Sequence, residues 1–177
     1  MRVIAGSLGG RQFKTPPGRR SHPMAEKTRG GLFNALGDII GLTLLDAFSG
    51  SGAVAFEAIS RGGLQSTAVE KSVLAYRVIK KNIDTLNLEE QVKATRANIS
   101  TWSDNNKDLE FDVVVCDPPY DAIKPDLLQK LSRHLKKDGI YVLCWPGSEK
   151  IRSFDGLTLL KNNNYGDSQL VFYKKTG

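Results

Sequence analysis

The spacing of apolar residues divides most of the chain into two alternating kinds of segment. From residue 43 onward, short apolar runs alternate with segments in which apolar residues recur every three or four positions. The first kind is typical of buried strands and the second of amphipathic helices. The predicted strands are 43–48 (TLLDAF), 66–71 (STAVEK), 92–97 (VKATRA), 111–119 (FDVVVCDPP) and 139–145 (GIYVLCW). The predicted helices are 51–61, 73–86 (with Leu74, Val78, Ile79, Ile83 and Leu86 facing inward), a short stretch near Ile99, and 125–135.

Alternation of helices with near-continuous apolar strands predicts a parallel sheet covered by helices on both faces. Segments 157–162 and 168–174, joined by an Asn-rich turn over 162–167, predict a terminal hairpin that adds two antiparallel strands. The sequence therefore predicts an α/β, Rossmann-like fold with a mostly parallel seven-stranded sheet. In such sheets, ligands bind beyond the carboxyl ends of the strands, near the point where the strand order reverses.

The N-terminal segment differs from the rest of the chain in charge. Residues 2–14 predict a small β-hairpin, a proline-rich loop follows, and apolar spacing predicts a helix over 25–38. The net charge is +6; the first 30 residues hold seven basic residues and one acid, whereas the remaining chain holds 18 of each. A basic segment on a neutral body indicates a polyanionic partner, most often nucleic acid, with a solubilising tail as the alternative. We expect residues 1–24 to be an extension of a domain formed by 25–177.

Length and composition favour a cytoplasmic protein with one core. The chain has 177 residues, and none of its apolar runs approaches the roughly 20 residues that span a bilayer. Its first ten residues are too weakly apolar for a signal peptide. Cys116 and Cys144 each lie in an apolar run, which predicts buried, reduced thiols, and the cysteines and histidines lack metal-site spacing. We therefore expect no membrane association and no metal.

A carboxylate and a glycine-rich loop follow the first of these strands. In LLDAFSGSGAVAFEA (44–58), Gly50 and Gly52 lie between strand and helix, where glycine lets the backbone approach a cofactor closely. The pattern also fits a dinucleotide loop, but pyrophosphate favours bare N–H groups there and Asp46 would repel it. The sulfonium and ammonium groups of S-adenosylmethionine are attracted by the same carboxylate. Asp46 thus favours this cofactor over a nicotinamide dinucleotide.

The next two strand ends carry polar residues that suit the same cofactor. Glu70 ends the second strand and is placed to accept hydrogen bonds from both ribose hydroxyl groups. Asn98, just past the third strand, could hydrogen-bond the adenine edge. Individually, Asp46 also fits a turn acid or a helix cap, and Glu70 a solvated charge. Their occurrence at successive strand ends beside a Gly-x-Gly loop favours a cofactor site.

The fourth strand ends in Asp117-Pro118-Pro119-Tyr120, next to the first strand in a doubly wound sheet. An amino group on a base or amide is a poor nucleophile because its lone pair is delocalised. The Asp117 carboxylate and the Pro118 carbonyl can accept its hydrogens and aim the lone pair at a methyl donor. The prolines fix the backbone, and Tyr120 offers a face on which a planar base can stack. A tight turn with Asp117 capping the next helix is the alternative.

These residues resemble the amino-methyltransferases that use S-adenosylmethionine, through LLDAFSGSG (44–52) and DPPY (117–120). With MRVIAGSLGGRQFKTPPG (1–18) and HPMAEKTRGGLFNAL (22–36), the resemblance narrows to bacterial 16S ribosomal RNA guanine-N2 methyltransferases of the RsmD type and covers essentially the whole chain. It implies a class I methyltransferase fold, S-adenosyl-L-methionine as cofactor, and methylation of a guanine N2 in 16S rRNA, as naked RNA or within a small ribosomal subunit or its assembly intermediate. We expect a monomer.

The resemblance also assigns roles to individual residues. The implied cofactor contacts are Asp46, Gly50, Gly52, Glu70 and Asn98, the amino-group site is Asp117, Pro118 and Tyr120, and the RNA-facing candidates are Arg11, Lys14, Arg19, Arg20 and Arg29. The chain departs from the family at His22-Pro23-Met24, where Arg-Pro-Thr is usual, and at Gly30-Gly31, where each glycine weakens a helix by about 1 kcal/mol. These departures affect the expected RNA docking and leave the methyl-transfer residues unchanged.

Three other functions use parts of the same pattern. A DNA adenine-N6 methyltransferase shares the DPPY motif but usually needs a larger target-recognition region. A non-catalytic RNA-binding protein could keep a degenerate cofactor fold, although intact Asp46, Glu70 and DPPY oppose this. A protein glutamine methyltransferase would more often carry asparagine in place of Asp117.

Overall fold

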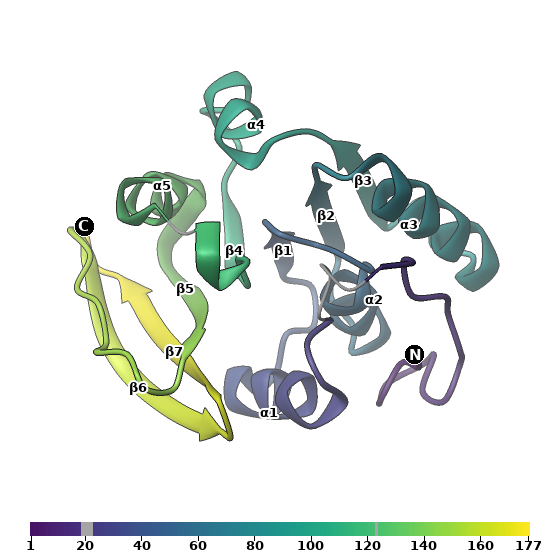
Figure 1. Ribbon diagram of the computed structural model, residues 1–177, viewed down its shortest axis with the longest axis horizontal. Helices are drawn as coiled ribbons and strands as arrows, with labels where there is room; N and C mark the ends of the chain where they lie inside the picture. Colours follow the sequence, from purple (N-terminus) through teal and green to yellow (C-terminus); the bar gives the residue numbers. More distant parts are fainter. Residues whose placement is uncertain (19–22, 123) are drawn as a thin grey trace.

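The computed structural model describes residues 1–18, 23–122 and 124–177. They form one seven-stranded sheet, with the strand order β3-β2-β1-β4-β5-β7-β6, and the helices that cover it (Figure 1). The strands are β1 (Thr43–Asp46), β2 (Gln65–Glu70), β3 (Val92–Arg96), β4 (Phe111–Cys116), β5 (Leu135–Pro146), β6 (Leu157–Tyr165) and β7 (Ser168–Lys175). The helices are α1 (Glu26–Leu36), α2 (Ala53–Ser60), α3 (Val73–Leu86), α4 (Ile99–Asn105) and α5 (Pro125–Leu131), with 3₁₀ turns η1 (Tyr120–Ala122) and η2 (Ser132–His134). In this described part, no helix is both long and apolar enough to cross a membrane.

The topology confirms the predicted doubly wound sheet. Strands β1 to β5 pair in parallel, and β7 pairs antiparallel with both β5 and β6. The chain runs outward from β1 through β2 to β3 and then returns to β4 on the other side of β1, so the order reverses between β1 and β4. Asp46, the last residue of β1, is in register with Ala68 of β2 and Val115 of β4. The carboxyl ends of β1, β2 and β4 therefore lie within about two residues of one another along the strand direction.

Two helical layers cover the sheet because its strands are apolar on both faces. On one face, Leu44, Val113 and Val142 pack against α1 and α2, and a neighbouring cluster joins α2, α3 and Ala68. On the other face, Leu45 and Val114 belong to a cluster that includes α4 and α5. Figure 1 shows α4 and α5 on the opposite side of the sheet from α1. The core thus lies on both faces of the sheet.

The N-terminal arm, defined here as residues 1–18, contains less regular structure than predicted. Instead of a strand pair, it has a single antiparallel bridge between Arg2 and Gln12, flanked by hydrogen bonds from the Val3 N–H to the Arg11 carbonyl (2.9 Å) and from the Gly10 N–H to the Val3 carbonyl (2.8 Å). Side-chain packing holds this turn, since Val3 and Phe13 are buried in the cluster of α2 and α3. The arm therefore shares a core with the two helices that follow β1 and β2.

Three other predictions differ in detail. Leu74 is 56% exposed because it lies in the first turn of α3, immediately after β2 ends. The Asn-rich segment expected to be a turn belongs to β6, which continues until Tyr165 pairs with Ser168, leaving only 166–167 as the turn. As β6 pairs on one side only, its polar side chains remain in solvent. The helix expected over 125–135 ends at Leu131, and β5 begins at Leu135.

Candidate cofactor and substrate site

The polar residues predicted at the strand ends do lie along one edge of the sheet. Strands β3, β2, β1 and β4 are consecutive neighbours in the sheet. Asp46 and Glu70 are the last residues of β1 and β2, and Asn98 and Asp117 follow β3 and β4. Backbone hydrogen bonds tie the segments beyond the strands together, for example from the Ala97 N–H to the Glu70 carbonyl at 3.1 Å. The structure therefore brings the predicted cofactor residues beside the predicted amino-group site.

Asp46 is a nearly inaccessible carboxylate at the end of β1. It is 1% exposed, and its Oδ2 accepts a hydrogen bond of 2.8 Å from the Ser49 hydroxyl. Burial raises the pKa of Asp46 to about 7; the Ser49 hydrogen bond opposes this rise, and the negative charges of Asp117 and Glu70 add to it. A buried anion among other anions is stabilised by a positively charged ligand. This environment suits the sulfonium and ammonium groups of S-adenosylmethionine.

The loop after Asp46 is open at Gly50 and packed at Gly52. Gly50 and Gly52 both adopt positive φ, at 57° and 86°. A side chain at Gly50 would meet no atom within 4 Å, whereas a Cβ at Gly52 would lie 2.4 Å from the Phe56 ring. The Gly50 N–H donates to Glu70 Oε2 at 2.9 Å, so the loop is fastened to the end of β2. The loop thus offers an open cradle of backbone next to two carboxylates.

The two glycines are expected to respond differently to alanine. Gly52→Ala should lower the free energy of unfolding by about 2 kcal/mol or more, since left-handed strain adds to a clash with Phe56. Phe56 has little room to move because Phe13 packs edge-on against it at 5.3 Å. Gly50→Ala should cost about 1 kcal/mol through strain alone. Urea unfolding of both variants without ligand checks this, and equal losses would contradict the assigned packing.

Glu70 and Asn98 have structural partners as well as free hydrogen-bonding capacity. Glu70 Oε1 accepts from the Ser72 N–H at 2.7 Å, in addition to the Gly50 contact. A carboxylate has about four lone-pair sites, so two remain for a diol. Asn98 Oδ1 accepts from the Ser100 N–H at 2.9 Å and caps α4, while Asn98 Nδ2 makes no hydrogen bond with the described residues. The capping contact leaves a donor that suits an adenine ring nitrogen.

The DPPY segment lies immediately beyond β4. Asp117 is half-buried, and burial raises its pKa to about 6. Pro118 is buried, whereas Tyr120 is 46% exposed and places its hydroxyl 3.6 Å from the Cys144 sulfur on β5. Burial also raises the pKa of the Cys144 thiol to about 12, so the thiol stays protonated. The tyrosine ring is therefore available for stacking, and Cys144 contacts its far end.

Both cysteines are free and buried, as predicted. Cys116 lies at the end of β4, where its sulfur contacts the Tyr141 hydroxyl at 3.1 Å. Burial raises the pKa of Cys116 to about 12. Neither thiol is a nucleophile at neutral pH.

The basic residues predicted to face RNA fall into three groups. Lys14 is exposed, and Arg11 is exposed but donates to the carbonyls of Thr85 (2.7 Å) and Leu86 at the end of α3. Arg19 and Arg20 lie outside the described residues. The expectation for Arg29 is wrong in this structure, because its side chain is fully buried.

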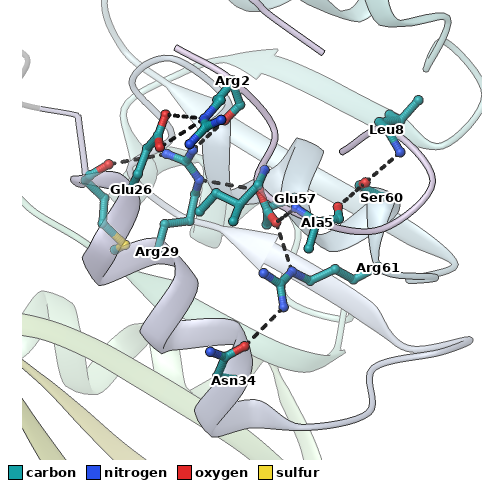
Figure 2. Close-up of polar contacts among 11 residues, drawn as sticks. Arg2, Ala5, Leu8, Glu26, Arg29, Asn34, Glu57, Ser60 and Arg61 are labelled. Carbon is teal, nitrogen blue, oxygen red and sulfur yellow. Dashed lines mark hydrogen bonds and ion pairs between the residues drawn. The ribbon is translucent and has the colours of Figure 1, made fainter. Parts of the chain in front are cut away.

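Arg29 is instead part of a buried charged cluster that holds the arm to the body (Figure 2). Its guanidinium lies 3.6 Å from Glu57 and donates to the carbonyls of Arg2 (2.6 Å) and Met24 (3.3 Å). Burial lowers the pKa of Arg29, and Glu57 opposes that shift. Glu57, fully buried on α2, also accepts the Ile4 N–H at 2.8 Å, the Ala5 N–H at 3.0 Å and Arg61 Nε at 2.9 Å. One carboxylate thus joins the arm, α1 and α2.

Replacing Glu57 by glutamine should destabilise the protein strongly. The change leaves the Arg29 guanidinium buried without an opposite charge, which typically costs about 3–5 kcal/mol. Glu90→Gln is a matched control, because Glu90 is exposed and makes no hydrogen bond or ion pair within the described chain; its effect should stay within about 0.5 kcal/mol. Chemical denaturation measures both, and similar stability of the two variants would refute the role of Glu57.

Sequence reasoning missed the contacts of four residues that shape this region: Ser49, Glu57, Asn82 and Cys144. A signal existed for Glu57, since a carboxylate inside the otherwise apolar AVAFEAIS helix needs a buried partner. Ser49 could have been found as a hydroxyl three residues after Asp46. Asn82 and Cys144 gave no signal, because their partners lie far away in the sequence.

The reversal of strand order beside β1, the antiparallel β7 and the polar strand ends together define a class I methyltransferase fold. A solved structure described as "Putative methyltransferase yhhF from Escherichia coli" superimposes with a TM-score of 0.88 at 24% identity, covering 99% of this chain and 98% of that one. The chain belongs to the family described as Conserved hypothetical protein 95, whose model matches residues 1–174, and its predicted RsmD-type membership is confirmed.

Two relatives show how far this similarity extends. "Putative rRNA methyltransferase YlbH" of Bacillus subtilis (strain 168) is 30% identical over an alignment of 184 positions that covers 100% of both proteins. "Ribosomal RNA small subunit methyltransferase D" of Buchnera aphidicola subsp. Acyrthosiphon pisum is 36% identical over 121 residues, covering 67% of this chain and 62% of that protein. The first alignment includes the N-terminal arm as well as the methyltransferase fold.

Proposed function

We propose that this protein transfers a methyl group from S-adenosyl-L-methionine to the exocyclic N2 of a guanine in 16S rRNA. The observation that carries the proposal is the placement of DPPY at the end of β4, directly beside the Asp46 loop at the end of β1. Relatives named as rRNA methyltransferases support RNA as the substrate class. The basic N-terminal arm supports a polyanionic substrate independently.

The residues at the edge of the sheet fit the cofactor. Asp46 would hold its positively charged portion, Glu70 its ribose hydroxyls and Asn98 its adenine, with the Gly50 loop in backbone contact. When bound, S-adenosylmethionine supplies an electrophilic methyl group on a positively charged sulfur. The buried carboxylate and the open glycine loop are the features that support this assignment, since both favour a cationic ligand lying against the backbone.

Asp117 and Pro118 would activate the substrate amino group. The Asp117 carboxylate and the Pro118 carbonyl accept its two hydrogens, which localises the nitrogen lone pair and aims it toward the methyl donor. With its pKa raised to about 6, Asp117 is mostly ionised at neutral pH and is also a better proton acceptor than an ordinary aspartate. Tyr120 would stack on a guanine that has left its base-paired position.

We propose 16S rRNA as the partner, either free or in a small ribosomal subunit or assembly intermediate, and a monomer acting in the cytoplasm. Phosphate contacts from the arm would position the RNA without reading its sequence. Specificity would come from the shape of the RNA and from the base held at Tyr120.

The decisive experiment supplies S-adenosylmethionine labelled in its methyl group to the protein with naked 16S rRNA, assembled small subunits or duplex DNA. Nucleoside analysis then identifies the product. N2-methylguanosine from RNA or subunits is the expected result, and the better substrate identifies the natural form. N6-methyladenine from DNA, or no transfer to any substrate while the cofactor binds, would overturn the proposal.

A further inference from the structure

Asn82, in the middle of α3, links the N-terminal arm to the loop that follows β1. Its side chain is 1% exposed. Asn82 Oδ1 accepts the Lys14 N–H at 2.9 Å, and Nδ2 donates to the Lys14 carbonyl at 2.8 Å. The same Nδ2 lies 3.4 Å from the carbonyl oxygen of Ser51, in the glycine loop. The arm at Lys14 and the loop at Ser51 are therefore joined through one amide group.

The two contacts with Lys14 fix direction as well as position. A side-chain amide that pairs with both the N–H and the carbonyl of one residue reproduces the pattern of a neighbouring strand. Because Asn82 is buried, loss of either contact would leave a polar group without a partner. The backbone at Lys14 is thus held in one orientation relative to α3.

An aromatic contact joins the neighbouring residues of the same two segments. Phe13 packs edge-on against Phe56 at 5.3 Å between ring centroids. The Phe56 ring, in turn, occupies the space beside Gly52 in which a Cβ would lie 2.4 Å from it. A polar and an apolar contact therefore fasten residues 13–14 to residues 51–52 independently. The arm has little freedom to slide along the loop.

The charge on Lys14 is available for binding, unlike that of Arg29. The Lys14 side chain is exposed and makes no hydrogen bond or ion pair with the described residues. The glycine loop, to which Asn82 links the Lys14 backbone, adjoins the sheet edge that carries the carboxylates of Asp46, Glu70 and Asp117, which repel RNA phosphates. A lysine whose backbone is held next to the loop can offset this repulsion where the nucleic acid must approach most closely.

We propose that Asn82 is a positioning residue for the RNA substrate: it fixes Lys14 beside the cofactor loop, where the Lys14 ammonium binds a phosphate close to the target nucleotide. The inference rests on the proposed function, because it takes RNA as the substrate. In this arrangement Asn82 touches neither RNA nor cofactor and acts through the backbone of Lys14.

The test is a double-mutant cycle on RNA binding. Lys14→Ala, Asn82→Ala and the double variant are compared with wild type by filter binding to naked 16S rRNA, with S-adenosylhomocysteine present, at several salt concentrations. Lys14→Ala should weaken binding roughly fivefold and reduce the slope of log Kd against log salt by about 0.9. In the Asn82→Ala background the same change should have less than about a twofold effect, because an unpositioned lysine binds weakly.

Two controls separate positioning from a general structural defect. Lys137→Ala removes an exposed lysine from the opposite edge of the sheet, at the start of β5, and should leave RNA binding unchanged within about twofold. Asn82→Ser, a milder change, is used in the cycle if Asn82→Ala lowers S-adenosylhomocysteine affinity by more than about threefold. The two Asn82 variants are first compared with wild type by thermal unfolding.

Two results would overturn the inference: an unchanged RNA Kd and salt slope in Lys14→Ala, or an equal effect of Lys14→Ala in both backgrounds. Methylation by wild type is measured in parallel. If Lys14→Ala weakens RNA binding only in the wild-type background but wild type forms no N2-methylguanosine, the proposed function is refuted and the positioning role of Asn82 stands. Normal methylation together with an equal effect of Lys14→Ala in both backgrounds would do the reverse. Failure of wild type to bind either naked 16S rRNA or assembled small subunits would overturn both.

Discussion

Asp117→Ala is expected to abolish methyl transfer while leaving cofactor affinity within about threefold of wild type. The variant removes the acceptor that we propose orients the substrate amino group, and losses of this kind reach about 10³-fold in kcat. The cofactor contacts proposed for Asp46 and Glu70 do not involve Asp117, and Glu70 is still held by the Gly50 N–H. Single-turnover methylation and calorimetric titration of S-adenosylhomocysteine measure the two effects separately.

Two further variants define the role of the charge at this position. Asp117→Asn keeps an acceptor oxygen but cannot take up a proton, so its activity should fall between those of alanine and wild type. Wild-type activity should rise with pH through about 6, where Asp117 ionises, and Asp117→Asn should lose this limb of the profile. Asp121→Ala, an exposed neighbour in η1, serves as the control and should stay active. Substantial turnover in Asp117→Ala would eliminate the proposed mechanism.

Asp46→Asn should weaken binding of S-adenosylmethionine yet stabilise the protein without ligand. The charged carboxylate contributes a charge-assisted contact of about 1.5–3 kcal/mol, so its loss should raise Kd at least about tenfold. In the free protein the same charge is unfavourable, since burial raises the pKa of Asp46 from 3.8 to about 7. A shift of this size means that ionised Asp46 destabilises the ligand-free protein by about 4 kcal/mol. Asparagine removes this cost, but its unpartnered amide offsets about half of the gain.

The effect of Asp46 on stability should depend on pH. A carboxyl group whose pKa is higher in the folded than in the unfolded protein contributes its full stabilisation below pH 3.8, and this stabilisation is lost as pH rises through about 7. Asp46→Asn should therefore show no gain near pH 4 and its full gain above pH 7 in denaturant unfolding. Affinity of wild type for S-adenosylmethionine should increase over the same interval as Asp46 ionises. An affinity that falls with rising pH would contradict the assignment of Asp46 to a cationic ligand.

Much of the fold could be predicted because the strands are short apolar runs followed by polar residues. Parallel strands end on the same edge of a sheet, so Asp46, Glu70 and Asp117 had to come close together once the strand assignment was correct. The apolar runs and the polar residues that follow them were therefore sufficient to predict both the sheet and the position of the candidate site. The capping role of Asn98 was less visible, because it depends on where α4 begins.

The residues that sequence reasoning misjudged depend on contacts between distant segments. Arg29 belongs to the basic N-terminal segment, and only the packing of α1 against α2 shows that its charge is opposed by Glu57. Asn82 looked like one polar residue among several on α3, because its partner Lys14 lies 68 positions earlier. Charge counted along a sequence thus overestimates the charge that a surface can present to RNA.

The attachment of the arm also has a consequence for the order of folding. Ile4 bonds to a residue 53 positions later, and Lys14 to one 68 positions later. The arm is synthesised before α2 and α3 and cannot dock until both are available, and contacts of such long range form late. Until then its basic side chains stay exposed on a nascent chain close to ribosomal RNA. Docking brings the Arg2 carbonyl onto the guanidinium of Arg29 in α1 and leaves Lys14 at the surface. The position proposed for RNA binding is therefore set only after the body of the protein has folded.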